Sequence, residues 1–501
     1  MMIYLHATLQ RHATNHGPGR GDRIRKEAMF PLYEANGGRI MAAWLCSAEV
    51  LASFLTVFLL CISIMTANAA GMVTTPIGSY QFNDNAMAIQ SDGKIVVAGT
   101  YQNDLGCDFA VVRYNSDGSP DTTFSGDGRV VTDFGSNREA GKAMAIQPDG
   151  KIVMAGWFHN GSDSDFAVVR YNIDGGLDTS FDEDGRVTTD FGGRSDQGNA
   201  VAIQPDGKIV AAGTSDSDFA VTRYNADGSL DTLFGVGGMV STDISIDDAG
   251  LAVALQPDCK IVVAGFISPD LYADIAVIRY NIDGSLDTTF NEDGKVTTDF
   301  GINKSCVSGR NIAIQPDGKI VIPGTSGEPF IPPPPYFFAD NAFDFAVARY
   351  NNDGSLDTSF NEDGKVTTDL YSSNDYGEAV TIQADGKIVI AGRIDNDFAV
   401  VRYNVDGSLD TSFDEDGKVT TDVGGSRGGC NAVAIQEDGK IVVAGYSDFD
   451  FAVARYNADG SLDKSFGGRD DDGEGNKGGG SSGGCFIGVI RDWFAHEVLL
   501  R

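Results

Sequence analysis

The sequence predicts an all-β fold: a single seven-bladed β-propeller of four-stranded antiparallel blades, with an N-terminal strand closing the seventh blade. One long segment recurs seven times in the 501 residues. Its form is A-I-Q-P-D-G-K-I-V-V-A-G, a variable stretch, then D-F-A-V-x-R-Y-N-x-D-G-S-L-D-T-S-F. Strand-forming runs separated by turn residues fill each copy, without helical periodicity, as expected of a stacked supersecondary unit. One glutamine marks each copy: Gln90, Gln147, Gln204, Gln256, Gln315, Gln383 and Gln436.

Each copy contains four runs of strand length. In the second copy they are Ala143–Gln147, Lys151–Gly156, Phe166–Tyr171 and Arg186–Phe191. Pro-Asp-Gly separates the first two runs, and this turn joins antiparallel neighbours because Pro presets φ and Gly accepts positive φ. The third and fourth runs are joined by a long, turn-rich segment whose leucine and phenylalanine we expect to be buried plugs. Four antiparallel strands per copy match one propeller blade and are too long for a rung of a β-helix.

The strand order predicts how the ring closes. A fourth strand rich in valine and threonine follows copies one to six, but the seventh copy ends at Phe466-Gly467 without it. The run Met72–Thr75 can supply the missing strand, so we expect the seventh blade to contain a strand from each end of the repeat region. This arrangement places the A-I-Q and I-V-V-A-G strands inside and the threonine-rich strand at the outer edge. The alternative is seven self-contained blades, with Met72–Thr75 beginning the first.

The repeated motif resembles the delta-60 repeat of bacterial secreted proteins. The resemblance covers residues 72–467 and implies a propeller-like fold without a general activity. Three departures are local. Cys259 stands where the turn glycine belongs, and we expect strain there because positive φ is unfavourable for a residue with a Cβ. Pro323 replaces the usual alanine, and a proline-rich insert lengthens the fifth copy.

The segment 1–70 reads as a leader. Its apolar region, residues 50–66, lacks charge and is followed by small residues, which predicts a cleaved secretory signal and a secreted or cell-surface location. An uncleaved anchor is the alternative. We expect the propeller to occupy 71–467.

Two further segments follow the predicted propeller. Residues 468–484 form a Gly/Asp-rich flexible linker, and 485–501 form a short tail. The tail is similar to the Cys-Phe-Ile tails of some bacterial envelope proteins, which suggests sorting or docking. It is too short and too charged to span a bilayer, so no membrane span is expected in the mature chain.

Composition narrows the range of partners. The formal net charge is −34, which repels nucleic acid and anionic lipid and excludes both as expected partners. The cysteines occupy unrelated positions of the repeat and lack C-x-x-C spacing, so neither a disulfide framework nor a redox pair is predicted. We expect a monomer.

The loops predict where a ligand binds. Successive loops of an up-and-down blade alternate between the two faces of the disc, so both variable loops share one face, and we expect a protein or glycan ligand there. Aromatic rings gather in those loops and in the insert 326–343. Packing over the blade tops is the alternative for each ring, and an insert without consequence is the alternative for 326–343. The candidate binding residues are Trp157, Phe158, Phe266, Tyr272, Phe330, Tyr336, Phe337, Phe338 and Tyr446.

The sequence assigns no cofactor, metal or catalytic residue. Calcium is conceivable at the acidic loop Asp178–Gly185, but the spacing fails the D-x-D-x-D-G pattern and suits ordinary turns. Beyond the leader the histidines are His159 and His496, and no hydrolase, zinc-protease or phosphate-loop motif is present. A binding or structural module is therefore expected. The alternative is an extracytoplasmic carboxylate-based hydrolase or lyase acting on polysaccharide or peptide.

Overall fold

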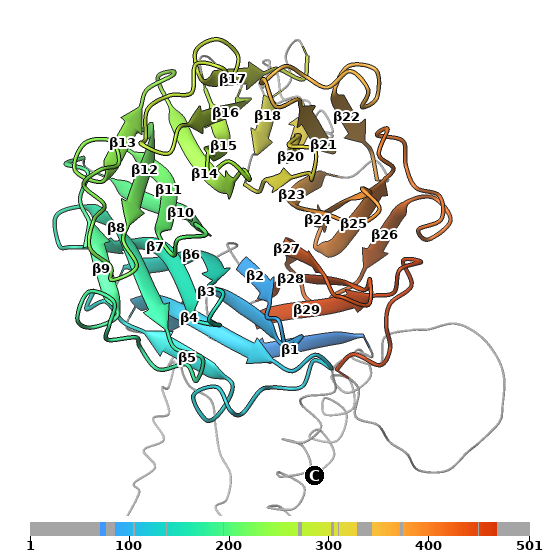
Figure 1. Cartoon of the computed structure of the whole chain (residues 1–501). Helices are drawn as coiled ribbons and strands as arrows, with labels where there is room; N and C mark the ends of the chain where they lie inside the picture. The colour runs from blue at the N-terminus through green and yellow to red at the C-terminus, as the bar shows by residue number, and fades with distance from the viewer. Residues whose placement is uncertain are drawn as a thin grey trace, which may run out of the picture. The chain divides into compact units, whose positions relative to one another are not determined.

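Seven antiparallel sheets form a ring around a central axis (Figure 1). The computed structural model describes residues 71–76, 86–103, 106–136, 138–193, 195–268, 273–301, 305–308, 310–327, 343–370, 374–448 and 450–467. These residues contain strands and turns but no helix, and so no helix long and apolar enough to cross a membrane. The predicted seven-bladed propeller is confirmed.

Within a blade the strands run in sequence order from the channel outward. Blade 1 contains β2 (Ala86–Ile89), β3 (Ile95–Asn103), β4 (Gly106–Tyr114) and β5 (Arg129–Thr132). Blade 2 contains β6 (Glu139–Ile146), β7 (Ile152–His159), β8 (Ser164–Tyr171) and β9 (Arg186–Thr189). Blade 3 contains β10 (Asp196–Ile203), β11 (Ile209–Ser215), β12 (Asp218–Tyr224) and β13 (Met239–Thr242). Blade 4 contains β14 (Asp248–Leu255), β15 (Ile261–Ile267), β16 (Asp274–Tyr280) and β17 (Lys295–Thr298).

Blade 5 departs from four strands because its inner strand is divided. Its strands are β18 (Ser305–Ser308), β19 (Ala313–Ile314), β20 (Ile320–Gly327), β21 (Phe343–Tyr350) and β22 (Lys365–Thr368). Both β18 and β19 pair with β20, and Pro323 lies opposite the gap between them. A proline cannot donate to the ladder, which fits an interruption at this point. Blade 6 is regular, with β23 (Asp375–Ile382), β24 (Ile388–Ile394), β25 (Asp397–Tyr403) and β26 (Lys418–Thr421).

The seventh blade is completed by the N-terminal strand, as predicted. It contains β27 (Gly428–Ile435), β28 (Ile441–Ser447) and β29 (Asp450–Tyr456), and β1 (Met72–Pro76) pairs antiparallel with β29 at its outer edge. The Thr75 hydroxyl lies 2.5 Å from the Tyr114 hydroxyl of blade 1. In blade 2 the equivalent Tyr171 hydroxyl donates to Thr132 of the preceding outer strand, so β1 occupies the place of a fourth strand. The alternative of seven self-contained blades is wrong.

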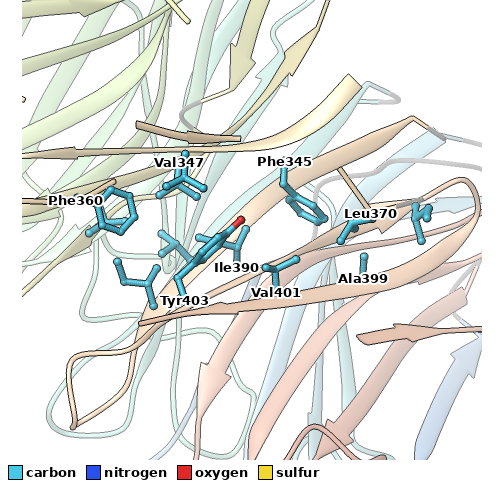
Figure 2. Close-up of a cluster of buried hydrophobic side chains, with 13 residues drawn as sticks. Phe345, Val347, Phe360, Leu370, Ile390, Ala399, Val401 and Tyr403 are labelled. Atoms are coloured by element: carbon cyan, nitrogen blue, oxygen red, sulfur yellow. The ribbon is translucent and has the colours of Figure 1, made fainter. Parts of the chain in front are cut away.

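Apolar side chains fill each junction between neighbouring blades. The described residues form seven buried clusters, and each combines residues of two adjacent blades. At the junction of blades 5 and 6, Phe345 and Val347 face Ile390 and Val401, with Phe360 beside them (Figure 2). The cluster with Val73, Ile95 and Phe451 joins blade 7 to blade 1. Seven clusters at seven junctions mean that the ring is closed, which leaves no open end of the stack.

The two faces of the disc differ as the sequence predicted. The Pro-Asp-Gly turns and the N-x-D-G-S-L-D-T-S-F loops lie on one face, which we name the constant face. The loops that differ between copies lie on the other, the variable face. The phenylalanine of each D-T-S-F loop is fully buried, as at Phe181 and Phe360, whereas the leucine, as at Leu177, is only partly buried.

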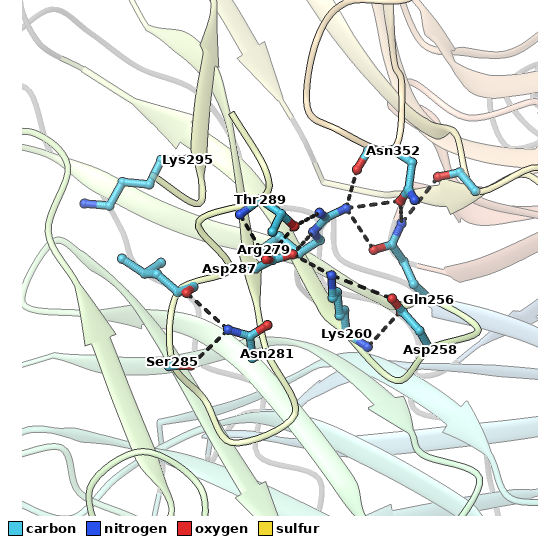
Figure 3. A network of polar contacts seen from close by, with 12 residues as sticks. Gln256, Asp258, Lys260, Arg279, Asn281, Ser285, Asp287, Thr289, Lys295 and Asn352 are labelled. Atoms are coloured by element: carbon cyan, nitrogen blue, oxygen red, sulfur yellow. Dashed lines mark hydrogen bonds and ion pairs between the residues drawn. The ribbon is translucent and has the colours of Figure 1, made fainter. Parts of the chain in front are cut away.

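An arginine of each blade ties the constant face to the next blade. In blade 4, Arg279 Nε lies 2.6 Å from the Asp287 carboxylate, Lys260 lies 2.9 Å from it, and Arg279 Nη1 donates to the Asn352 carbonyl of blade 5 (Figure 3). The Arg279 guanidinium also covers the Phe290 ring, 4.6 Å from its centroid. The equivalent arginine of blade 7 donates to a blade 1 carbonyl. The equivalent arginines are Arg113, Arg170, Arg223, Arg349, Arg402 and Arg455.

Cys259 adopts the strained conformation that the sequence predicted, with φ of 65° in the turn between β14 and β15. A residue with a Cβ in this region carries about 1–2 kcal/mol of strain, part of which is offset because glycine has more freedom when unfolded. We therefore expect Cys259→Gly to raise the free energy of unfolding by about 0.5–1 kcal/mol, measured by urea denaturation. The reverse change at the equivalent turn of blade 5, Gly318→Cys at φ of 86°, should destabilise. Equal stability of Cys259→Gly and the parent would contradict the strain.

Candidate functional site

A β-bulge in the inner strand places one variable side chain of most blades at the channel. The ladder between β10 and β11 shifts between Gly198 and Ala200, so Asn199 is the extra residue. A Cβ on the facing Gly213 would lie only 1.8 Å from the Gln197 carbonyl oxygen, so a glycine is required beside the bulge. The same shift recurs in blades 2, 4, 6 and 7. The bulged residues, with Arg310 from the gap in blade 5, form what we name the channel ring: Lys142, Asn199, Leu251, Arg310, Glu378 and Asn431.

The channel ring surrounds a cavity of about 770 Å³ at the variable-face end of the channel, the channel mouth. Side chains from blades 3 and 4 also line this cavity, including Ser195 and Ser217 from variable loops and Thr214 from β11. A narrower space of about 190 Å³ continues into the channel, lined mainly by alanine and branched apolar residues such as Ala200 and Val253. Ring residues such as Lys142 and Arg310 also line this narrower space, so polar groups extend from the mouth into the channel.

The channel ring offers both charges and several hydrogen-bonding groups. Arg310 Nε lies 3.5 Å from the Glu378 carboxylate, which links blades 5 and 6 across the ring. The Asn199 amide donates to the Gly250 carbonyl at 2.9 Å. The Asn431 carbonyl oxygen is buried and accepts no hydrogen bond from the described residues. This arrangement can donate to and accept from a polar ligand at several points around one centre.

Four of the aromatic residues predicted to bind a ligand belong to the described part of the chain, and they lie outside the lining of the channel mouth. Trp157 and Phe158 lie near the end of β7, where the Phe158 ring is 6.1 Å from the Phe134 ring. Phe266 lies in β15 and is partly buried, whereas Tyr446 in β28 is only 8% exposed and packs against its own inner strand at Gly429. Their role in binding stays a prediction. The remaining predicted residues lie outside the described part of the chain: Tyr272, Phe330, Tyr336, Phe337 and Phe338.

Sequence reasoning missed the channel ring, although a signal was present. The run preceding each landmark glutamine repeats as G-x-A-V-A-I-Q with small changes, and x varies from lysine to leucine to glutamate. The predicted inner strand of the second copy began at Ala143, whereas β6 begins at Glu139. A bulge interrupts the period-two alternation, so the residues before it did not read as strand.

The described lining of the channel mouth offers carboxylates, hydroxyls and a lysine amine as nucleophiles or bases. The described residues that line it include the carboxylates Asp216 and Glu378 but no histidine or cysteine. His159 ends β7, away from the channel ring, and its backbone N–H donates to the Arg138 carbonyl. Cys430 is buried, and burial raises the pKa of its thiol to about 12, so it stays protonated at neutral pH.

The acidic loop Asp178–Gly185 lies on the constant face, where its carboxylates form turns and ion pairs. Asp178 accepts hydrogen bonds from Arg170 at 2.7 Å and from the Ser180 hydroxyl at 2.7 Å. Burial opposes ionisation, but the hydrogen bonds from Ser180 and Lys151 and the charge of Arg170 hold the pKa of Asp178 well below its usual range. Asp184 accepts the N–H of Arg186 two residues on. These contacts are those of turns and ion pairs.

Repeat, ring and channel together define a β-propeller repeat protein. A family model described as "Domain of unknown function (DUF5122) beta-propeller" matches one segment in each of the seven copies, and each segment ends at the phenylalanine of D-T-S-F or its equivalent. The matched segments are residues 90–124, 147–181, 204–234, 256–290, 336–360, 383–413 and 436–466. No curated protein matches the chain at a significant level.

Several solved structures are similar to this chain at low sequence identity. A virginiamycin B lyase from Staphylococcus aureus is 9% identical, with 77% of this chain and 98% of that chain covered and a TM-score of 0.43. A polysaccharide lyase is 12% identical, with 76% and 91% covered and a TM-score of 0.43. Plexin A of Drosophila in complex with Semaphorin 1b is 9% identical, with 77% and 87% covered and a TM-score of 0.42.

Proposed function

We propose that this protein is a binding module that takes a polar ligand, a glycan or a protein segment, in its channel mouth. The channel ring carries the proposal. One position differs between blades while the residues around it repeat, so its side chain is free of the packing that the other positions must satisfy. A cavity of about 770 Å³ with convergent polar groups has the size and character of a ligand site.

The proposal places the protein outside the cytoplasm, as a monomer of the delta-60 repeat family that is secreted or displayed on the cell surface. The apolar stretch at 50–66 with small residues after it supports export, and the motif of residues 72–467 supports the family. The tail 485–501 would then serve sorting or docking. N-terminal sequencing of the protein isolated from cells checks the export step, since an apolar segment that is retained would contradict cleavage.

Substitutions in the channel ring test the site. Leu251 occupies the bulge of blade 4, so the fold accepts leucine there, and Asn199→Leu with Asn431→Leu should preserve the ring while removing two amides. After a glycan and peptide array identifies a ligand, we expect this double variant to bind it at least about tenfold more weakly, since each lost hydrogen bond to a buried polar group costs about 1 kcal/mol or more. Isothermal titration calorimetry measures the change.

A matched variant controls for general effects on the surface. Leu233→Ala changes a side chain that is 81% exposed in the D-T-L-F loop of blade 3, on the constant face, and binding should stay within about twofold of the parent. If the double variant and Leu233→Ala bind equally well, the ligand does not use the channel mouth. The variable-face aromatics Trp157 and Phe266 would then be the next residues to substitute.

Two carboxylates at the channel mouth favour a second candidate, an extracytoplasmic hydrolase or lyase acting on polysaccharide or peptide. Asp216 and Glu378 both line the cavity, and a carboxylate can act as a general base. If the parent protein releases fragments from a bound polymer and Glu378→Gln does not, the result would support an enzyme. Binding without product favours the binding module.

A further inference from the structure

Three acids from separate segments meet at several junctions between blades on the variable face. The first stands at the start of the third strand of a blade, the second follows the fourth strand, and the third begins the inner strand of the next blade. In each group, one carboxylate oxygen per residue lies within 4.8 Å of the others. Three such groups carry the argument: Asp165, Asp190 and Asp196 between blades 2 and 3; Asp218, Asp243 and Asp248 between blades 3 and 4; and Asp344, Asp369 and Asp375 between blades 5 and 6.

The third acid of each group is fully buried, yet one of its carboxylate oxygens accepts no hydrogen bond from the part of the chain that the structure describes. Asp248 is 0% exposed, and its Oδ2 accepts the backbone N–H groups of Ile244 and Ser245 at 2.7 and 2.8 Å. Its Oδ1 is buried and has no hydrogen bond from the described residues. Asp375 and Asp196 repeat the pattern: a backbone N–H of the preceding loop donates to Oδ2, and none of the described residues donates to Oδ1. A buried acceptor left in this way is destabilising unless another group satisfies it.

Repulsion among the three carboxylates of each group is also destabilising. Asp243 and Asp218 bring two further carboxylate oxygens within 4.8 Å of an oxygen of the buried Asp248. Asp369 and Asp344 lie in the same way beside the buried Asp375. Three carboxylates facing one another repel each other unless a cation lies between them.

The chemistry of the group points to calcium. Calcium takes six to eight oxygen ligands at about 2.3–2.6 Å, so two ligands of one ion are at most about 5 Å apart, as these oxygens are. Zinc is disfavoured because neither histidine nor cysteine contributes. Magnesium requires near-ideal octahedral geometry, which three carboxylates from three separate segments are less suited to provide.

We propose that the junctions between blades 2 and 3, 3 and 4, and 5 and 6 each bind a calcium ion through these three carboxylates. Each ion would join the third and fourth strands of one blade to the inner strand of the next, and so fasten the variable face as the arginines fasten the constant face. The ion would satisfy the unpartnered Oδ1 and neutralise the repulsion. Water and backbone carbonyls would complete the coordination.

Two other junctions act as internal comparisons. Between blades 6 and 7, Asp397 and Asp422 keep the first two places, but Gly428 begins β27 and no buried acid is present. Between blades 1 and 2, Glu139 is buried with Asp108 and Asp133 nearby, but its two oxygens already accept the N–H groups of Phe134 and Ser136. We therefore expect no ion at either of these junctions and one ion at each of the three junctions named above.

Calorimetric titration of calcium chloride into the full chain after EDTA treatment tests the proposal. We expect about three ions to bind, and saturating calcium to raise the thermal midpoint by about 5 °C or more, with a smaller rise for magnesium at equal concentration. Absence of binding at millimolar calcium, or a midpoint that calcium does not change, would overturn the proposal. It would also mean that the clustered acids share protons instead.

Matched substitutions locate the ions. Asp248→Asn should lower the number of bound ions by one, whereas Asp422→Asn at the junction of blades 6 and 7 should leave the number unchanged. If Asp248→Asn fails to fold by circular dichroism, Asp243→Asn replaces it, because that side chain is exposed. An unchanged count in the folded variant, or the loss of an ion in Asp422→Asn, would refute the assignment of the sites. None of these results depends on ligand binding at the channel mouth.

Discussion

Replacing Val73 with aspartate is expected to lower the free energy of unfolding by about 4 kcal/mol, because the change removes a buried side chain from the strand that closes the ring and inserts an unpaired charge. Val73 is 3% exposed, pairs with Val453 and belongs to the cluster that joins blade 7 to blade 1. The loss has a second component, since a displaced β1 exposes the edge of β29. Urea denaturation of the full chain measures it.

The neighbouring residue provides the control. Thr74 lies on the same strand but is exposed, so Thr74→Asp introduces the same charge without entering the cluster and should cost less than about 1 kcal/mol. Similar losses for the two variants would show that charge near the strand, not closure of blade 7, sets the stability. A parent-like Val73→Asp would mean that blade 7 is stable without β1.

The closing strand shows how much of this fold can be derived from residues alone. Counting strands per copy was sufficient, because Lys-Val-Thr-Thr is absent after Phe466 and a similar run occurs at Met72–Thr75. Turn residues were equally informative, since Pro-Asp-Gly and N-x-D-G permit few backbone conformations.

The channel ring and the acidic groups could not be derived in this way. The ring depends on a bulge, and a single extra residue reverses which face of the strand its neighbours occupy. Asp218, Asp243 and Asp248 come from three segments, and the sequence does not state that their oxygens converge. Asp248 also reads as a loop residue, although it begins β14 and is fully buried. Burial of an acid depends on the neighbouring blade, which local patterns do not describe.

Arg349→Met is expected to cost about 2–4 kcal/mol of unfolding free energy, because it removes one of the two cations that pair with a buried carboxylate and leaves a carbonyl without its donor. Arg349 is 1% exposed, its Nε lies 2.7 Å from Asp357, and its Nη1 donates to the Val405 carbonyl of blade 6 at 2.6 Å. Methionine retains much of the contact with the Phe360 ring, so the loss isolates the charge. Arg129→Met is the matched control: its partner Asp127 lies at 3.0 Å, but the side chains are 49% and 56% exposed, and the loss should stay below about 1 kcal/mol.

The pH dependence separates charge from packing in the Arg349→Met result. Burial opposes ionisation of Asp357, but the hydrogen bonds from Ser359 and Lys319 and the charge of Arg349 hold its pKa well below the usual range. A lowered pKa contributes stability that is present above the unfolded value of about 4 and is lost as the pH falls toward the folded value. The difference between parent and Arg349→Met should therefore be largest near pH 7 and shrink below about pH 4. If the difference is the same at pH 7 and pH 3, lost packing over Phe360 explains the cost, and the arginine does not fasten the blades through its charge.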